Sequence, residues 1–314
     1  MNKIGAFFKL VRWPNLLITA LMMFLVYHCI LGMPSTLGFT LLVISMVFVV
    51  AGGYVINDIL DMEIDAINKP DRQIVGRVFT ERQGKVFYWI LTVVGLACAL
   101  ASTVMAHGRN FLPIFSCMVL LACILYSYSN RYKKSLVIGN LIVSLSVAFA
   151  VFLPWLFQVF AMLGNKEMLA ENVEWMHVTL RIVLIYTVFA FLMTLIREII
   201  KDMEDVKGDG RSHCRTIPVV WGMNTALIIV IALSFLTCLG VSITSDYLYK
   251  EFGLSITSYM LKASYLLLLG FGIAGNTYSL LNDKSKKTGK NFHIQSIAMK
   301  IIMFIGVLSM FFIR

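Results

Sequence analysis

Charged residues are scarce in this sequence: they make up 14% of its 314 residues, while 59% are hydrophobic. The mean hydropathy is +0.82. Soluble domains carry about a quarter charged residues, and disordered chains are poorer in apolar residues than this one. The composition therefore excludes both classes and indicates a chain that lies in a lipid bilayer.

Several sequence signatures are also missing. The six cysteines are scattered without a C-x-x-C pair or the spacing of zinc ligands, so we interpret them as small buried hydrophobic residues. There is no Walker A sequence, no H-E-x-x-H and no G-x-S-x-G. ATP-driven transport, zinc-dependent hydrolysis and serine hydrolysis thus lack their usual motifs.

Long runs without a charged residue predict nine transmembrane helices, since about 20 apolar residues cross the hydrocarbon core. The stretch between Arg12 and Asp58 has room for two of them, separated by a turn at 33–35. The other seven are expected at 86–108, 110–130, 135–165, 182–196, 216–245, 263–282 and 292–313. We therefore expect an all-α integral membrane protein that forms one domain over residues 1–314.

Basic residues lie mostly on one side of these expected spans. The tail and loops on that side hold 20 of the 27 Lys and Arg residues, whereas the opposite loops, with Arg314, hold four. The positive-inside rule then predicts a multi-pass plasma-membrane protein with a cytoplasmic N-terminus and an external C-terminus. Much of the net charge of +10 is accounted for by this topology, and we expect no nucleic-acid partner.

Acidic residues gather at two expected cytoplasmic helix ends. Of the 17 Asp and Glu residues, six fall within 58–81 and five within 198–209. The polar residues of the first end, at i, i+4 and i+8, are Asn57, Asp61 and Asp65. Those of the second, at i, i+4, i+7 and i+11, are Glu198, Asp202, Asp205 and Asp209. Each spacing places the side chains on one helix face.

The separation of the two acidic ends suggests an internal repeat. The first acidic end lies at the end of the second expected span, and the other lies at the end of the sixth, four spans later. Each would thus end the second span of its half. The repeat would relate spans one to four, at about 1–134, to spans five to eight, at about 135–285, with the ninth span at about 292–313 outside it.

Like charges on one helix face repel each other, and a divalent cation would relieve the repulsion. Oxygen ligands favour Mg²⁺ over zinc or copper. A diphosphate would complete the coordination of such an ion. Bases that lie within or after the acidic ends, such as Arg72 and Lys201, would neutralise its remaining charge. In a membrane protein, this chemistry points to a polyisoprenoid diphosphate. The alternative is that these are solvated loop acids that pair with nearby bases.

The segment N-D-x-x-D-x-x-x-D at 57–65 and the segment D-M-E-D-V-K-G-D at 202–209 resemble the two Asp-rich motifs of the UbiA superfamily of intramembrane prenyltransferases. The resemblance extends along most of the chain, from R-W-P-N at 12–15 to T-I-P at 216–218. It implies nine helices in a single bundle around a central cavity with a cytoplasmic cap. It also implies Mg²⁺-dependent transfer of a polyprenyl group from its diphosphate to a lipophilic acceptor.

Carried over position by position, the resemblance implies roles for nine residues. The metal ligands would be Asn57, Asp61, Asp65, Asp202, Asp205 and Asp209. The diphosphate contacts would be Asn57, Arg72, Lys133 and Lys201. Among these, the residues expected to be catalytic are Asp61, Asp65, Asp202 and Asp205.

Within the family, the run R-E-I-I-K-D-M-E-D at 197–205 looks most like the branch that prenylates geranylgeranylglyceryl phosphate in ether-type lipid synthesis. Branches that prenylate an aromatic quinone precursor, 4-hydroxybenzoate or dihydroxynaphthoate, share the same core motifs and are one alternative. A cation transporter is an alternative from another class. The acids of a transporter usually lie near the middle of its spans, whereas these lie at helix ends.

Overall fold

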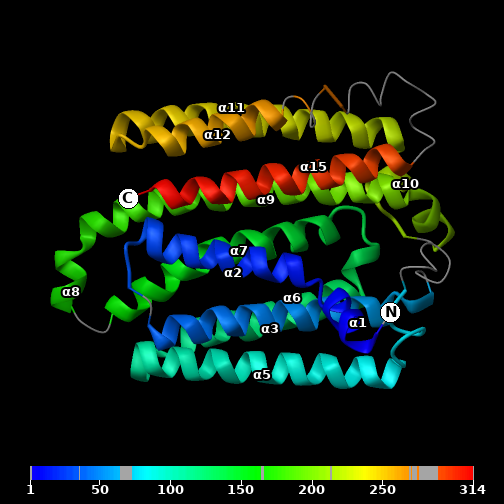
Figure 1. Cartoon of the computed structure of the whole chain (residues 1–314), viewed down its shortest axis with the longest axis horizontal. Helices are drawn as coiled ribbons and strands as arrows, with labels where there is room; N and C mark the ends of the chain where they lie inside the picture. The colour runs from blue at the N-terminus through cyan, green and yellow to red at the C-terminus, as the bar shows by residue number, and fades with distance from the viewer. Residues whose placement is uncertain are drawn as a thin grey trace. The chain divides into compact units, whose positions relative to one another are not determined.

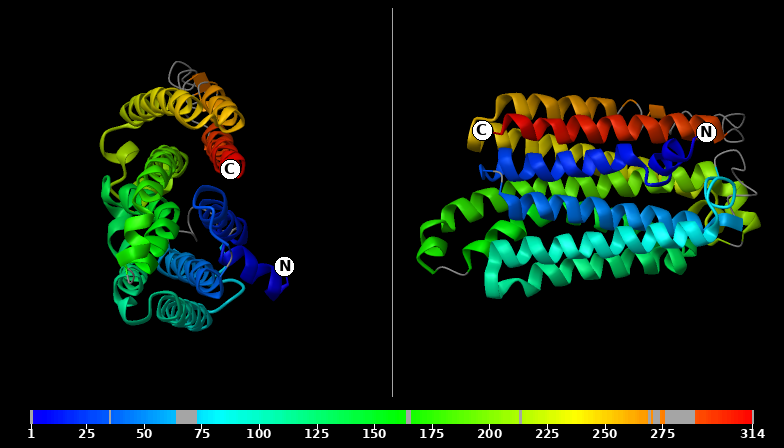
Figure 2. Two further views of the ribbon diagram at one scale, coloured as in Figure 1. Left: turned by 90° about the vertical axis from the view of Figure 1, so that its left-hand side faces the viewer. Right: turned by 60° about the horizontal axis from the view of Figure 1, so that its bottom comes forward.

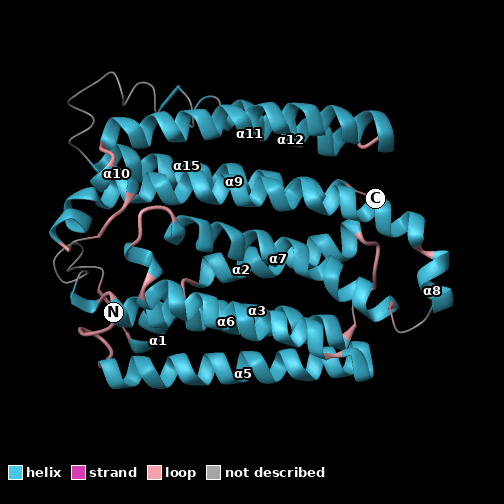
Figure 3. Ribbon diagram, turned by 180° about the vertical axis from the view of Figure 1, so that it is seen from behind, coloured by secondary structure: helices cyan, strands magenta, loops and turns pink. Residues whose placement is uncertain are grey.

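The computed structural model describes residues 2–34, 36–63, 73–163, 166–212, 214–268, 270, 274–275 and 289–313. Apart from one isolated bridge between Val75 and Phe79, the secondary structure of these residues is helical (Figure 3). The chain divides into two compact units, Met1–Lys133 with Ala150–Arg181, and Lys134–Phe149 with Ile182–Arg314.

Eight helical segments among the described residues are long and apolar enough to cross a membrane, which confirms a multi-pass helical membrane protein. They are Trp13–Ile30, α3 (Leu37–Leu60), α5 (Glu81–His107), α6 (Leu112–Asn130), α7 (Ile138–Met162), α9 (Val173–Arg211), α11 (Met223–Phe252) and Asn291–Phe312. The span expected at 263–282 falls partly on α12 (Ser255–Leu267) and partly outside the described residues.

In the first unit, a short helix, α1 (Lys3–Leu10), precedes the first span, which consists of α2 (Trp13–Leu25) and a π-helical turn at Val26–Ile30. Helices α3, α5 and α6 follow and lie side by side (Figure 1). Glycines allow α3 and α5 to approach closely. A Cβ atom on Gly52 would lie 2.8 Å from Thr92 Oγ1, and one on Gly95 would lie 2.9 Å from Val49 Cγ2.

Several helices extend beyond the uncharged runs that predict them. Helix α5 begins at Glu81 rather than 86, because a capping box precedes it. Thr80 Oγ1 accepts from Gln83 N–H at 3.3 Å, and Gln83 Oε1 accepts from Thr80 N–H at 3.0 Å. The uncharged run at 182–196 is likewise only part of α9, which extends from Val173 to Arg211 and includes the second acidic end, as its spacing predicts. Charged residues end a run of apolar residues, but they do not end a helix.

In the second unit, α11 and α12 run side by side (Figures 1 and 2). The boundaries expected at 245 and 263 are wrong, because α11 continues to Phe252 and α12 begins at Ser255. Gly253, with φ of +65°, makes the reversal in the left-handed conformation that glycine adopts without strain. An ion pair of 2.8 Å joins Asp246 of α11 to Lys262 of α12. Helix α15 (Gly289–Leu308) and a 3₁₀ turn at Ser309–Phe312 complete the unit.

Candidate active site

The first acidic site lies where α3 ends. Asn57 is in the last turn of α3, and Asp61 is the residue that caps it. The side-chain amide of Asn57 donates to Asp61 Oδ2 at 2.8 Å. Both side chains are buried, with residue exposures of 9% and 4%. The structure thus brings these two predicted residues together, while Asp65 and Arg72 lie outside the described residues.

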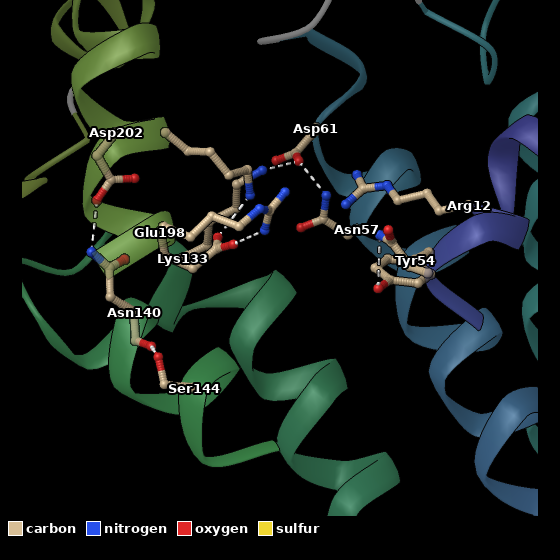
Figure 4. Close-up of polar contacts among 12 residues, drawn as sticks. Arg12, Tyr54, Asn57, Asp61, Lys133, Asn140, Ser144, Glu198 and Asp202 are labelled. Carbon is tan, nitrogen blue, oxygen red and sulfur yellow. Dashed lines mark hydrogen bonds and ion pairs between the residues drawn. The ribbon is translucent and has the colours of Figure 1, made fainter. Parts of the chain in front are cut away.

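A lysine from a distant part of the sequence completes this arrangement. Lys133 lies in a 3₁₀ turn, Tyr132–Lys134, that follows α6. Its Nζ forms an ion pair with the same oxygen, Asp61 Oδ2, that accepts from Asn57. A buried carboxylate is costly unless it is paired and hydrogen-bonded, and Asp61 has both kinds of partner in the lysine and the amide (Figure 4).

Arg12 ties the start of the first span to the same end of α3. It has a φ of 53°, the left-handed conformation that costs a non-glycine residue roughly 1–2 kcal/mol. Its Nη2 lies 3.1 Å from Asp58 Oδ1, and its guanidinium carbon lies 4.7 Å from the centroid of the Tyr54 ring. Asn15 Nδ2 donates to the Tyr54 hydroxyl at 3.3 Å. These contacts hold the turn before α2 against the residues that flank Asn57.

The second acidic site lies in the last turns of α9. Glu198, Asp202, Asp205 and Asp209 belong to this one continuous helix, as the spacing predicts. Glu198 is buried, with 6% exposure, and the three aspartates are half-buried. Asp209 Oδ2 accepts from the hydroxyl of Thr216 at 3.3 Å. Thr216 is the residue that precedes α10 (Ile217–Val220).

In this second site, the basic side chains form ion pairs with Glu198. Lys201 Nζ is 2.7 Å from Glu198 Oε2, and Arg197 Nη1 is 2.7 Å from Glu198 Oε1. Lys201, which the sequence predicts as a diphosphate contact, is therefore held beside the acidic face by a buried carboxylate. Arg197 was not predicted, although it is adjacent to Glu198 in the sequence.

Asn140 is a further residue that the sequence interpretation missed. Its Nδ2 donates to Asp202 Oδ2 at 2.8 Å, and its backbone carbonyl accepts from the hydroxyl of Ser144 at 2.7 Å (Figure 4). Asn140 lies in the first turn of α7, inside a long uncharged run. The available signal was its polarity, because a polar side chain in a transmembrane helix usually has a specific partner.

Other acidic residues pair with nearby bases, as the alternative interpretation expects. Glu81 lies 2.6 Å from Lys85 one turn along α5, and Glu204 Oε1 lies 3.0 Å from His293 Nδ1 on α15. Ion pairing therefore accounts for part of each acidic cluster. Asp61, which is itself paired with Lys133, and Asp202 share a further contact, because each accepts a hydrogen bond from an asparagine.

The donor chemistry of both sites fits Mg²⁺. Among the residues described, no three His, Cys, Asp or Glu side chains converge closely enough to hold a metal ion by themselves. Mg²⁺ is usually bound through one or two carboxylates, with water and substrate phosphates as the other ligands. Carboxylate and amide oxygens next to lysines therefore suit an ion that arrives with a phosphorylated substrate better than a metal held by protein alone.

Comparison with known proteins identifies the family of the chain. The model of the UbiA prenyltransferase family matches residues 12–305. A digeranylgeranylglyceryl phosphate synthase from Methanococcus maripaludis is 31% identical to the chain, over 97% of this chain and 99% of the relative. The enzyme of that name from Sulfurisphaera tokodaii is 32% identical, over 74% of this chain and 78% of the relative.

Solved structures share the fold. A structure of a digeranylgeranylglyceryl phosphate synthase aligns with a TM-score of 0.63 and 25% identity, over 99% of this chain and 98% of the other. A UbiA homologue from Archaeoglobus fulgidus, bound to DMAPP and Mg²⁺, aligns with a TM-score of 0.57 and 16% identity, over 97% of this chain and 98% of the other.

Proposed function

The chain belongs to the UbiA prenyltransferase family, and on this premise we propose that it transfers a geranylgeranyl group from geranylgeranyl diphosphate to geranylgeranylglyceryl phosphate. The main support for this acceptor is the relative from M. maripaludis, which aligns over nearly the whole of both chains. A second relative carries the same name. These similarities favour a glyceryl phosphate acceptor over an aromatic quinone precursor, and family membership favours prenyl transfer over cation transport.

We propose that both acidic sites serve the diphosphate of the donor. The metal ligands would be Asn57, Asp61, Asp65, Asp202, Asp205 and Asp209. The phosphate contacts would be Asn57, Arg72, Lys133 and Lys201. When bound, Mg²⁺ would neutralise the diphosphate and make it a better leaving group. Support comes from the oxygen donors of Asn57, Asp61 and Asp202 and from the lysines that lie beside them.

Lys133 and Lys201 then act on the departing group. Each ammonium group forms an ion pair with a carboxylate, Lys133 with Asp61 and Lys201 with Glu198. The allylic C1–O bond of the donor breaks, and its electron pair leaves with the diphosphate. The two lysines offset that negative charge. The glyceryl hydroxyl oxygen forms the new ether bond to C1, and the hydroxyl proton is released.

We propose nine transmembrane spans around a central cavity, with a cytoplasmic cap, in one domain whose halves are a repeat. The N-terminus would be cytoplasmic and the C-terminus external, in the plasma membrane. The support is the excess of Lys and Arg on one side of the expected spans. The eight described spans supply most of such a bundle.

The test is product formation by the purified protein in detergent. Radiolabelled geranylgeranyl diphosphate and Mg²⁺ are supplied with geranylgeranylglyceryl phosphate, 4-hydroxybenzoate or dihydroxynaphthoate as acceptor. We expect a labelled digeranylgeranylglyceryl phosphate, identified by mass spectrometry, and its loss when EDTA removes the metal. Transfer to an aromatic acceptor alone would overturn the proposed acceptor. Cation flux without Mg²⁺ and without any prenylated product would overturn prenyl transfer itself.

A further inference from the structure

We propose that Asn140 is a positioning residue for Asp202, to which its amide donates as the amide of Asn57 donates to Asp61 in the first acidic site. Asn57 Nδ2 donates to Asp61 Oδ2 at 2.8 Å, and Asn140 Nδ2 donates to Asp202 Oδ2 at 2.8 Å. The same donor group thus meets the same acceptor atom at the same distance in both sites. This inference rests on the proposed metal-binding role of Asp202.

The second acidic segment has no such donor of its own. In the first, the residue four positions before Asp61 is Asn57, whose amide can donate. The residue four positions before Asp202 is Glu198, an acid already held by a lysine and an arginine. An ionised carboxylate only accepts hydrogen bonds. The amide that contacts Asp202 therefore comes from another helix, α7, at a separation of 62 residues in the sequence.

A neutral donor is suited to a carboxylate that must bind a cation. The amide of Asn140 occupies one lone pair of Asp202 Oδ2 and so restrains the side-chain torsions, yet it adds no positive charge that would oppose a metal ion. Asn140 lies near the start of α7, and the hydroxyl of Ser144 contacts only its backbone carbonyl. Residues that orient metal ligands in this way typically contribute about 10- to 100-fold to metal affinity.

The experiment measures binding of Mn²⁺ to the purified full chain in the presence of inorganic diphosphate, by electron paramagnetic resonance. Asn140→Ala and Asn140→Leu both remove the amide, and leucine keeps nearly the same volume. We expect each variant to weaken Mn²⁺ binding about tenfold or more. Transfer should need correspondingly more Mg²⁺ for half-saturation, while kcat at saturating Mg²⁺ stays within about threefold of wild type.

Ser144→Ala is the matched control, because it removes the hydrogen bond to the Asn140 backbone without touching the amide. It should bind Mn²⁺ as the wild type does. Native Mn²⁺ affinity in a folded Asn140→Leu variant would overturn the inference, as would an equal loss in Ser144→Ala. A wild-type protein that fails to bind Mn²⁺ with diphosphate would overturn it together with the metal site. One that binds Mn²⁺ but does not prenylate geranylgeranylglyceryl phosphate would overturn only the proposed acceptor.

Discussion

At the end of α3, Asp61 accepts from Asn57 and forms an ion pair with Lys133. Near the end of α9, Asp202 accepts from Asn140, and the neighbouring Lys201 is held by Glu198. Both central aspartates thus have an amide donor, but they differ in where the cation lies. In the first site, Lys133 forms an ion pair with Asp61, the proposed metal ligand. In the second site, Lys201 forms an ion pair with the buried Glu198, one turn before Asp202.

This difference has a consequence for metal binding. A metal ion that reaches Asp61 has to replace the ammonium of Lys133, and a lysine released from Asp61 can then contact a phosphate oxygen. Binding of metal and diphosphate to the first site should therefore favour each other. At Asp202 the amide of Asn140 can stay in place when a metal binds, so the second site should depend less on the diphosphate.

The largest expected effect comes from removing the charge of either central aspartate. Asp61→Asn and Asp202→Asn keep the side-chain shape but lose a proposed ligand, so each should lower the rate of geranylgeranyl transfer about 100-fold or more. The assay is product formation at saturating donor and Mg²⁺. Asp246→Asn is the control, because Asp246 is an exposed carboxylate on α11, paired with Lys262. Full activity in either site variant would remove that aspartate from the metal site.

Substitution of the lysines tests the difference between the sites directly. Lys133→Met removes the cation from Asp61, so Mn²⁺ without diphosphate should bind about tenfold more tightly, while KM for the donor rises. Lys201→Met keeps the contact between Asn140 and Asp202, so KM should rise without tighter Mn²⁺ binding. Titration of both variants with Mn²⁺ separates the two cases. Equal Mn²⁺ affinities in the two variants would contradict the comparison.

A smaller effect, on stability, is expected at Glu198. Glu198→Gln leaves Arg197 and Lys201 without their carboxylate. Breaking a buried ion pair costs about 3–5 kcal/mol. The side chain of Lys201 is 34% exposed, so we expect a loss of roughly 2 kcal/mol in the free energy of unfolding. Denaturant unfolding in detergent, with wild type and Lys85→Ala alongside, measures the loss. An unchanged midpoint would mean that Glu198 does not stabilise this end of α9.

The smallest effect is expected at an exposed pair. Lys85 and Glu81 are 2.6 Å apart, but their side chains are 59% and 50% exposed. Pairs of this kind contribute about 0.3–0.5 kcal/mol. Lys85→Ala should therefore shift the unfolding midpoint only slightly and leave the transfer rate unchanged. A stability loss as large as that of Glu198→Gln would show that burial does not distinguish these ion pairs.

Much of the fold is predictable from apolar runs, and the errors have a common cause. The runs locate all eight of the described spans, but they miss the first turn of α5 and the last turns of α9 and α11. In those turns charged residues lie at helix ends, where water or an ion pair satisfies them. A capping box at Thr80 and a left-handed glycine at Gly253 set the actual boundaries.

The candidate site divides in the same way. The contact between Asn57 and Asp61 follows from a spacing of four residues in a helix, and so does the common helix of Glu198 and Asp202. The partners Lys133 and Asn140 lie 72 and 62 residues from Asp61 and Asp202. No local pattern links such distant residues, so the family resemblance was needed for Lys133, and Asn140 was missed.

The sequence by itself determined that the chain is a helical membrane protein with two acidic helix ends, because burial in lipid and the i, i+4 geometry of a helix depend on neighbouring residues. Only the tertiary structure decided which basic or amide side chain contacts which acidic one. Electrostatic and hydrogen-bond energies depend on distances in space, and helix packing sets those distances without regard to separation along the chain. For this reason Asp61 forms an ion pair with Lys133, while Asp202 accepts a hydrogen bond from the amide of Asn140.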